Sequence, residues 1–386
     1  MIKIIKNYKR VLAKLNHNFK NYHLLSVEKS SQDKFDFKKN LKENISDKFI
    51  TRLSNYAKYL KDNKPKEKKN DLWTVVAKER NHEKFINTVC EAKNNKDNFM
   101  EAISNCGKSN LLHGFGPNRY SYKDLISKKI FRKKEKLDLL DYLLSLSEYY
   151  KIIKVYNPEQ GGWVVEKEDF DNLINQIFKK KKISIFKTPN FYFGYKFQKE
   201  FLFPKDFKGL HTAERLSDIY KKNNLLEVAE IGGGAGYTCH YFRQLIDSTY
   251  SIYDLPYTSL LQAIYLMMSL GEDSIHLGNE KINNKKKVFI KPYWKIFDHK
   301  NNKKILWFNE DSFPEIDFDL SKKYIKKIFK SNKSFLLSIN QEARNNFGTE
   351  VNQHTVYDLT HKHQRIYRSR DFLRPGYIEE LIEIKN

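Results

Sequence analysis

The spacing of apolar and polar positions divides the chain into a helical first part and a second part of alternating strands and helices. Among the lysines of the first residues, Ile4, Val11 and Leu15 recur at helical spacing, which is typical of a surface helix that buries one face. The leucines of residues 136–155 recur more densely, which is typical of a packed core helix. We therefore predict helices within three ranges: 1–70, 71–104 and 136–155.

Between these two parts, glycines, a proline and short aromatic runs replace the helical pattern. Residues 160–165 predict a turn and a short strand, residues 183–186 and 191–197 predict further strands, and residues 204–209 predict a linker. The chain is thus expected to form three parts: a basic, mainly helical domain at 1–155, short strands and a linker at 156–210, and a third domain at 211–386.

From His211 onward, short apolar runs alternate with helical stretches. This alternation is typical of an α/β fold, in which a mostly parallel sheet carries helices on both faces. Helices are predicted at 237–248 and 256–270. Strands are expected to end at Ile231, Asp254, Ile290, Asn309 and Asn340, with a last strand at 377–384.

The most informative stretch runs from Glu230 to Tyr237 and reads E-I-G-G-G-A-G-Y. A carboxylate ends an apolar run and a cluster of glycines follows. Glycines let the backbone approach a ligand closely, and the free N–H groups of the following helix start face that ligand. A dinucleotide fingerprint requires G-x-G-x-x-G, but the third position counted from Gly232 and Gly234 is Tyr237. The spacing therefore disfavours an NAD-dependent dehydrogenase.

A second acidic residue, Asp254, ends the next strand. An α/β nucleotide-binding fold places its acceptor for ribose hydroxyls at the tip of the second strand. The alternative is a glycine turn that serves only tight packing, with Asp254 as a helix-start acid before Pro256. A non-catalytic scaffold that keeps the cofactor fold is another alternative, and the intact glycines and ribose acid count against it.

The pattern E-x-G-x-G-x-G resembles the first motif of S-adenosylmethionine-dependent methyltransferases. Over residues 211–386 the chain also resembles the bacterial sugar O-methyltransferase family, which implies a class I Rossmann-like fold. The matching pieces are the glycine loop, Y-D-L-P at 253–256, P-Y-W at 292–294, N-E-D-S-F-P-E-I at 309–316, S-I-N at 338–340 and G-Y-I-E-E-L at 376–381. The chain departs from the family at Ile316, where methionine is usual, and at Asp311 and Pro314.

This resemblance implies methyl transfer from S-adenosylmethionine to a sugar hydroxyl in the biosynthesis of surface polysaccharide or another glycan, with S-adenosylhomocysteine as the product. It places the Glu230 carboxylate near the amino acid end of the cofactor, and the glycines beneath its ribose and methionine portion. The cofactor-binding residues that it implies are Glu230, Gly232, Gly233, Gly234, Gly236, Tyr237, Asp254, Leu255, Pro292 and Asn309.

Methylation of a sugar hydroxyl calls for a general base, or for a metal that acidifies the hydroxyl, because the hydroxyl is a poor nucleophile at neutral pH. The loop after the fourth strand offers Asp311 and Glu315 as candidate bases. Asn309 and Ser312 would orient the cofactor or the acceptor. The alternative is helix capping, in which Asp311 or Ser312 caps a short helix whose first turn holds Glu315.

Histidines after the fifth strand, His354 and His361, are the second pool of candidate bases. A histidine base would suit neutral pH. With His363 and Asp358 they could also ligate a divalent metal, but their spacing matches no strong signature, and we predict no metal site. Surface histidines in a loop are the alternative.

The candidate acceptor-binding residues are Ser312, Asn340, Arg368 and Arg119. Arg368 belongs to a cluster of four arginines between residues 365 and 374 that could clamp a phosphate or carboxylate. Arg119 and His113 belong to a loop with two glycines and a proline, which could face the substrate. Solvated surface arginines and a simple interhelical turn are the respective alternatives.

The net charge of +24 is concentrated in residues 1–210, which carry +20, whereas residues 211–386 carry +4. Such an excess would suit an anionic acceptor (nucleotide-, phosphate- or lipid-linked), peripheral contact with an anionic membrane, or nucleic acid. A composition rich in lysine and asparagine that merely solvates the surface would give the same charge.

An RNA methyltransferase is the alternative enzyme that this basic charge would suit. The fourth strand ends in N-E-D-S-F-P and not in the N-P-P-Y type of loop that acts on base amines. The sequence also has no Pro-Cys pair for attack on cytosine. Nucleic acid is therefore disfavoured as the partner.

Three scattered cysteines, Cys90, Cys106 and Cys239, indicate a reducing compartment and no disulfide scaffold. The first residues lack an apolar core of signal-peptide length, and no apolar run approaches transmembrane length. The expected location is the cytoplasm.

Overall fold

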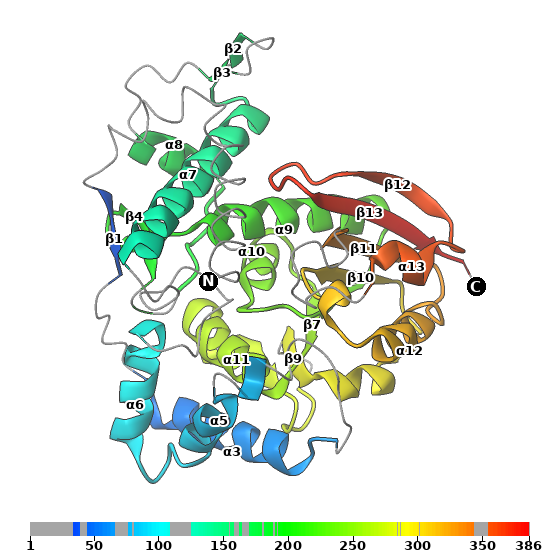
Figure 1. Cartoon of the computed structure of the whole chain (residues 1–386). Coiled ribbons are helices and arrows are strands. Elements are labelled where there is room, and N and C mark those ends of the chain that lie inside the picture. The colour runs from blue at the N-terminus through cyan, green and yellow to red at the C-terminus, as the bar shows by residue number, and fades with distance from the viewer. Residues whose placement is uncertain are drawn as a thin grey trace. The chain divides into compact units, whose positions relative to one another are not determined.

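The computed structural model describes residues 34–38, 45–65, 76–78, 81–108, 125–153, 155–157, 162–163, 170–179, 181–187, 190, 192–283, 285, 287–300, 302–342 and 354–385. The chain forms two compact units, each of which combines two stretches of sequence (Figure 1). One unit holds residues 1–42 and 103–211, and the other holds residues 43–102 and 212–386. We call the second the sheet unit.

The sheet unit is built on an eight-stranded sheet in the order β12-β13-β11-β10-β6-β7-β9-β8. The strands from β11 to β8 run parallel, whereas β13 is antiparallel to both β11 and β12. This mostly parallel sheet confirms the expected α/β class. The strands are β6 (Glu227–Ile231), β7 (Thr249–Asp254), β8 (Ile275–Leu277), β9 (Val288–Pro292), β10 (Ile305–Glu310), β11 (Ser334–Gln341), β12 (Arg365–Arg370) and β13 (Tyr377–Ile384).

Helices pack on both faces of this sheet. On one face, the ring of Phe242 in α10 lies 5.4 Å from that of Tyr250 in β7. On the opposite face, Ala229 and Trp307 share a core with Tyr324 of α12. The helical elements from residue 204 onward are α9 (Pro204–Lys222), α10 (Tyr237–Leu245), α11 (Pro256–Leu270), η4 (Glu272–Ser274), η5 (Tyr293–Asp298), η6 (Phe313–Glu315), α12 (Phe318–Ile328) and α13 (Val356–Thr360).

Most elements of this region match the sequence pattern. The strand ends at Ile231 and Asp254, the helix at 256–270 and the last strand at 377–384 are confirmed. The helix after the glycine loop ends at Leu245, before the expected position 248, because Ile246 takes extended backbone (φ −136°, ψ 125°). The pattern does not predict β8, which is three residues long, or β12, whose three arginines hide a strand signal.

Helices α3 (Asp47–Asp62) and α5 (His82–Cys90) belong to the sheet unit, as does α6 (Lys96–Ser104) up to residue 102. The side chain of Ser46 accepts a hydrogen bond from the Phe49 N–H and caps α3. Leu53 and Leu60 on the buried face of α3 have no exposed surface. This grouping differs from the expected boundary at residue 155, because α3 packs on α11 within the sheet unit.

The described residues of the other unit include a three-stranded sheet, a two-stranded sheet and several helices. Phe35 of β1 and Tyr195 of β4 pack edge to face, with ring centroids 5.3 Å apart. A strand therefore stands where the helical pattern of residues 1–70 predicts none, and residues 183–186 form no strand. The elements are β1 (Phe35–Phe37), η2 (Cys106–Lys108), α7 (Leu125–Tyr149), β2 (Val155–Asn157), β3 (Gly162–Trp163), α8 (Phe170–Phe178), β4 (Phe193–Phe197) and β5 (Glu200–Leu202).

The core helix expected at 136–155 is the C-terminal part of α7, which ends at Tyr149. Its leucines, such as Leu139 and Leu143, are fully buried. Across the part of the chain that the structure describes, no helix is both long enough and apolar enough to cross a membrane.

Candidate functional site

The glycine loop leaves the carboxyl end of β6 in a left-handed conformation. Gly232, Gly234 and Gly236 have φ of 73°, 58° and 93°, values that favour glycine over any residue with a Cβ. A Cβ on Gly232 would lie 2.3 Å from Ser312 Oγ, whereas a Cβ on Gly234 would meet no atom of the described residues within 4 Å. Gly234 therefore faces open space, and Gly232 is locked against the loop after β10.

Asp254 ends β7 beside this loop and accepts hydrogen bonds from it. Its Oδ2 accepts from the Gly234 N–H at 3.2 Å and from Gln262 Nε2 at 2.7 Å, while its Oδ1 accepts from the Leu255 N–H at 2.7 Å. Gln262 Nε2 also donates to the Gly234 carbonyl at 3.0 Å. Burial raises the pKa of Asp254 to about 7, although these donors act to lower it.

The strand order places this loop at the reversal point of the sheet. From β6 the chain proceeds to β7 on one side, and it later returns to add β10 on the other side of β6. In open α/β sheets, ligands bind outside the carboxyl ends of the strands at such a point. The open space beside Gly234 lies at this reversal point.

Glu230 lies beneath the loop and not at its surface. It is 3% exposed, and its Oε2 accepts a hydrogen bond from the Tyr250 hydroxyl at 2.9 Å. A Cβ on Gly233 would lie 2.8 Å from the same oxygen. The Glu230 carboxylate is therefore buried against the backbone of the turn at Gly233.

Among the other proposed cofactor residues, Tyr237 is buried at the start of α10, and Leu255 precedes α11 as its N-cap residue. Pro292 ends β9 directly opposite Asp254 in the strand register. All three therefore lie at the same edge of the sheet as the glycine loop.

Asn309, Ser312 and Asn340 form a buried amide and hydroxyl network at the ends of β10 and β11. Asn309 Nδ2 donates to the Ile231 carbonyl at 2.8 Å and to Ser312 Oγ, and Ser312 Oγ donates to the same carbonyl at 3.1 Å. Asn340 Nδ2 donates to Asn309 Oδ1 at 2.8 Å. Asn309 has no exposed surface. Hydrogen bonds of these three side chains thus link the ends of β10 and β11 to the Ile231 carbonyl, where the glycine loop begins.

Asp311 is paired with a buried arginine. Arg374 Nη1 donates to both carboxylate oxygens of Asp311, at 2.7 and 2.9 Å, and its Nη2 donates to Glu310 Oε1 at 2.8 Å. The guanidinium of Arg374 therefore occupies both carboxylate oxygens of Asp311. Glu315 lies half-buried in η6, where its N–H donates to the Ser312 carbonyl at 2.9 Å.

The two candidate histidines lie in different surroundings. His354 is 3% exposed, its ring centroid lies 5.0 Å from that of Phe318, and it borders the backbone of Phe313 in η6. Burial lowers its pKa below the usual range, so the ring is neutral at neutral pH. His361, by contrast, is exposed, and its Nδ1 lies 3.2 Å from the Asp358 carbonyl of its own helix.

Within the described ranges, no three His, Cys, Asp or Glu side chains gather as a metal site would require. The structure therefore does not bring His354, His361, His363 and Asp358 together as ligands.

The arginines of β12 and its following loop are matched by carboxylates. Arg365 Nε lies 2.6 Å from Glu380 Oε2, and Arg368 lies 3.2 Å from the same oxygen and also contacts Glu342. Arg374 pairs with Glu310 and Asp311. Three of the four arginines that were expected to clamp an anion are therefore paired with carboxylates of the chain. Arg119 and His113 lie outside the described residues.

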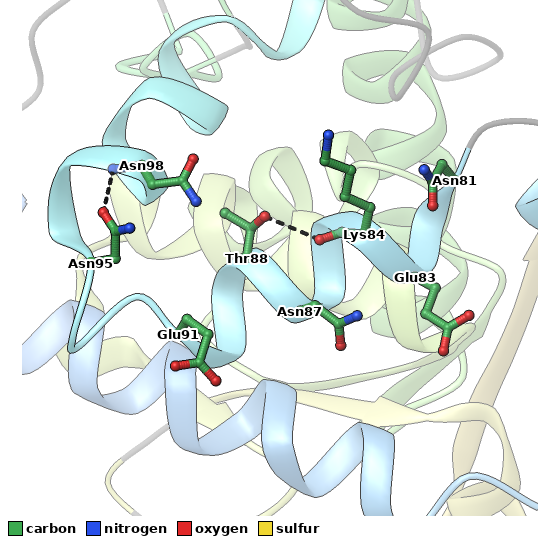
Figure 2. Close-up of a pocket in the computed structure, with 8 residues that line it drawn as sticks. All are labelled: Asn81, Glu83, Lys84, Asn87, Thr88, Glu91, Asn95 and Asn98. Carbon is green, nitrogen blue, oxygen red and sulfur yellow. Dashed lines mark hydrogen bonds between the residues drawn. The ribbon is translucent and has the colours of Figure 1, made fainter.

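A polar groove of about 480 Å³ lies on α5 and the start of α6. Figure 2 shows the side chains that line it, all of them polar. Thr88 Oγ1 donates to the Lys84 carbonyl at 3.0 Å, and the Asn98 N–H donates to Asn95 Oδ1 at 3.1 Å. These bonds are those of a solvated helix face and a helix cap, so we do not assign the groove to the candidate site.

The sequence analysis assigns no role to Gln262 and a different role to Arg374. Gln262 donates from α11 both to Asp254 and to the Gly234 carbonyl of the glycine loop. Arg374 appears there only as part of an anion clamp. Its pairing with Asp311 spans 63 positions, which no local pattern reveals.

No protein-family model matches the chain, and no curated protein matches it. Solved structures with a similar arrangement include an O-methyltransferase family protein from Burkholderia thailandensis, at 12% identity over 47% of this chain and 60% of that chain, with a TM-score of 0.33. Magnesium protoporphyrin IX methyltransferase from Synechocystis PCC 6803 matches at 11% identity over 47% of this chain and 83% of that chain, with a TM-score of 0.33. Identities and TM-scores this low leave the activity to be argued from the residues of this chain.

Proposed function

We propose that the protein is an S-adenosylmethionine-dependent O-methyltransferase that acts on a sugar hydroxyl in glycan assembly. The observation that carries this proposal is the Asp254 carboxylate hydrogen-bonded to the Gly234 N–H at the reversal point of the sheet. A ribose acid held against a glycine loop is the arrangement by which α/β folds bind an adenosine-containing cofactor. The E-x-G-x-G-x-G spacing favours S-adenosylmethionine over a dinucleotide.

The residues present fit this cofactor. The open space beside Gly234 admits a ligand against the backbone, and the carboxylate of Asp254 is within reach of hydroxyl donors placed there. When bound, the cofactor supplies a sulfonium methyl group for in-line displacement. Leu255 and Pro292, at the tips of neighbouring strands, would border its ribose and base.

The acceptor side requires a base that is unprotonated at neutral pH. His354 meets this requirement because burial holds its ring neutral, and it borders η6 next to Ser312. We assign the acceptor proton to His354 rather than to Asp311, since Asp311 is held by Arg374. Glu315, in the same turn, is the second candidate.

His354 would accept the acceptor proton at a ring nitrogen as the acceptor oxygen takes the methyl group that the cofactor would supply. The protein then mainly aligns the acceptor oxygen and excludes water. The sugar acceptor follows from the resemblance of residues 211–386 to sugar O-methyltransferases. At the carboxyl edge of the sheet, the Asp311 carboxylate that pairs with Arg374 favours a neutral sugar over an anionic one.

The experiment is a calorimetric titration of the full chain with S-adenosylhomocysteine, beside the variant Asp254→Ala. We expect binding by the wild type and its loss in the variant, because the ribose hydroxyls lose their acceptor. A folded wild-type protein that does not bind would overturn the proposal. Equal binding by both proteins would place the cofactor elsewhere in the molecule.

A further inference from the structure

We propose that two residues of α3, Arg52 and Tyr56, position the turn that carries the ribose acid, so that residues 43–102 complete the cofactor site from behind. The inference rests on the proposed function. It assigns a role to a segment that lies more than a hundred residues before the glycine loop in the sequence. Neither residue touches the open space beside Gly234, so both act through other residues.

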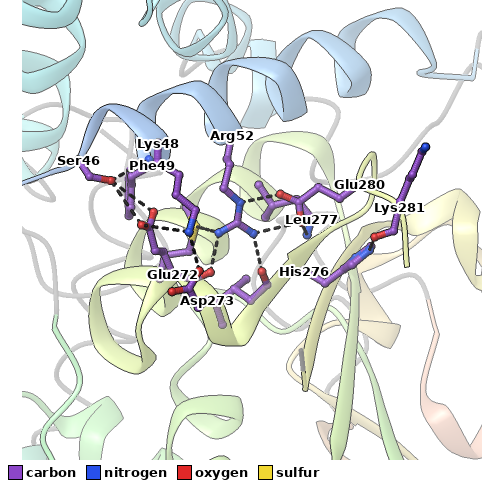
Figure 3. A network of polar contacts seen from close by, with 12 residues as sticks. Ser46, Lys48, Phe49, Arg52, Glu272, Asp273, His276, Leu277, Glu280 and Lys281 are labelled. Carbon is purple, nitrogen blue, oxygen red and sulfur yellow. Dashed lines mark hydrogen bonds and ion pairs between the residues drawn. The ribbon is translucent and has the colours of Figure 1, made fainter. Parts of the chain in front are cut away.

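Arg52 binds the segment between α11 and β9 (Figure 3). Its Nε lies 2.6 Å from Glu280 Oε1, its Nη1 donates to the Glu272 carbonyl at 2.5 Å, and its Nη2 donates to the Ile275 carbonyl at 2.5 Å. Its side chain is only 10% exposed. Charge-assisted bonds from one planar group to three points fix the end of α11 and the edge strand β8 together.

Tyr56 lies one helical turn further along α3 and reaches the middle of β9. It has no exposed surface, and its hydroxyl donates to the Ile290 carbonyl of β9 at 3.2 Å. The same hydroxyl lies beside Ser259 of α11, whose Oγ donates to the Asp254 carbonyl at 3.3 Å. Tyr56 is thus separated from the ribose acid by one side chain.

The start of α11 is held by a second contact from the same segment. The ring of His82 in α5 stacks on that of Tyr257, with centroids 3.7 Å apart and planes 7° apart. Helix α11 carries Gln262, which donates to both Asp254 and Gly234. A shift of α11 would therefore misplace the acid and the glycine loop at once.

The first test compares Arg52→Met with Arg52→Lys and with the control Lys48→Met. Lys48 lies on α3, as Arg52 does, and pairs with Asp273. Its side chain, however, is 59% exposed. We expect S-adenosylhomocysteine to bind Arg52→Met about tenfold or more weakly, with partial rescue by lysine and no change in the control. Binding is measured well below the melting temperature, where the chain is folded and a loss of stability alone leaves Kd unchanged.

The second test uses Tyr56→Phe, with Tyr59→Phe as the matched control three residues along α3. Loss of the Tyr56 hydroxyl should weaken binding by about three- to tenfold. In a double-mutant cycle with Ser259→Ala, the two effects should be non-additive if Tyr56 acts through Ser259. Additive effects would show that Tyr56 does not act through Ser259.

Both tests separate this inference from the proposed function. Wild-type binding that survives unchanged in Arg52→Met and Tyr56→Phe would refute the positioning role and leave the cofactor assignment intact. Absence of wild-type binding would refute the function itself. A lower melting temperature with an unchanged Kd would show that α3 only stabilises the fold.

Discussion

At the scale of single residues, the site depends on one buried carboxylate with three donors. Asp254 is 7% exposed and accepts from two backbone N–H groups and one amide. Burial disfavours its charged form, whereas the donors favour it, and burial prevails with a pKa of about 7. The ionisation of Asp254 should therefore be coupled to ligand binding.

We predict that S-adenosylhomocysteine binds more tightly as pH rises toward 7.5 and releases a proton in doing so. Ribose hydroxyls that donate to Asp254 stabilise the carboxylate and lower its pKa from about 7. Affinity should fall by up to about tenfold per pH unit below 7 and level off above it. Calorimetry in buffers of different ionisation enthalpy measures the released proton. A pH-independent Kd between 5.5 and 7.5 would contradict the coupling.

A second prediction at this scale concerns the base. His354→Gln should lower kcat by about a hundredfold or more while the Kd for S-adenosylhomocysteine stays unchanged, because the histidine acts on the acceptor proton. Its lowered pKa places the rise of kcat with pH below 6.5. His361→Gln, at an exposed position, is the control. Equal kcat in His354→Gln and wild type would shift the role to Glu315.

At the scale of elements, the strand–loop–helix unit from β6 to α10 uses its glycines in two different ways. Gly232 has no room for a side chain because Ser312 lies against it, and the network of Asn309 holds Ser312 there. Gly234 has room, and that room is where the ligand is proposed to bind. Packing and binding are therefore separable along three residues of the same loop.

The pair Gly232→Ala and Gly234→Ala tests this division. Gly232→Ala adds a methyl group at a φ of 73° and against Ser312, which should cost more than about 2 kcal/mol in the free energy of unfolding. Gly234→Ala, with a φ of 58° and no neighbour within 4 Å among the described residues, should cost about 1 kcal/mol but weaken ligand binding at least about tenfold. Urea denaturation and calorimetry measure the two effects. The division fails if Gly234→Ala binds as tightly as wild type.

At the scale of the whole molecule, residues 43–102 and 212–386 form one compact unit although more than a hundred residues separate them in the sequence. The apolar face of α3 and the arginine network of Figure 3 make this connection. Such long-range contacts are expected to make the unit unfold as one cooperative body.

We predict that Leu53→Ala, in α3, destabilises the sheet unit by about 2 to 5 kcal/mol, because the side chain is fully buried. The same loss of stability should appear in the glycine-loop region. It is measured as faster hydrogen exchange of the backbone amides of α10. Asn55→Ala, at an exposed position of the same helix, is the control. Unchanged exchange in α10 would mean that α3 opens independently.

The sequence by itself determined the α/β class, the ends of β6 and β7, the bounds of α11 and the positions of the glycine loop and Asp254. These features follow from short periods and local backbone preferences: runs of apolar residues predict strands, and glycine clusters predict left-handed turns. Elements with weak local signals escaped prediction, such as the charged strand β12 and the three-residue β8.

Only the tertiary structure decided which of the candidate side chains meet. In the structure, Asp311 pairs with Arg374, and the side chains of Asn309 and Ser312 hydrogen-bond to the residue before the glycine loop. His354 is buried beside η6, whereas His361 is exposed. The tertiary structure also joined α3 to α11 through Arg52 and Tyr56. Burial and partner charges depend on contacts between residues far apart in the chain, and these set both the pKa of a group and its freedom to act.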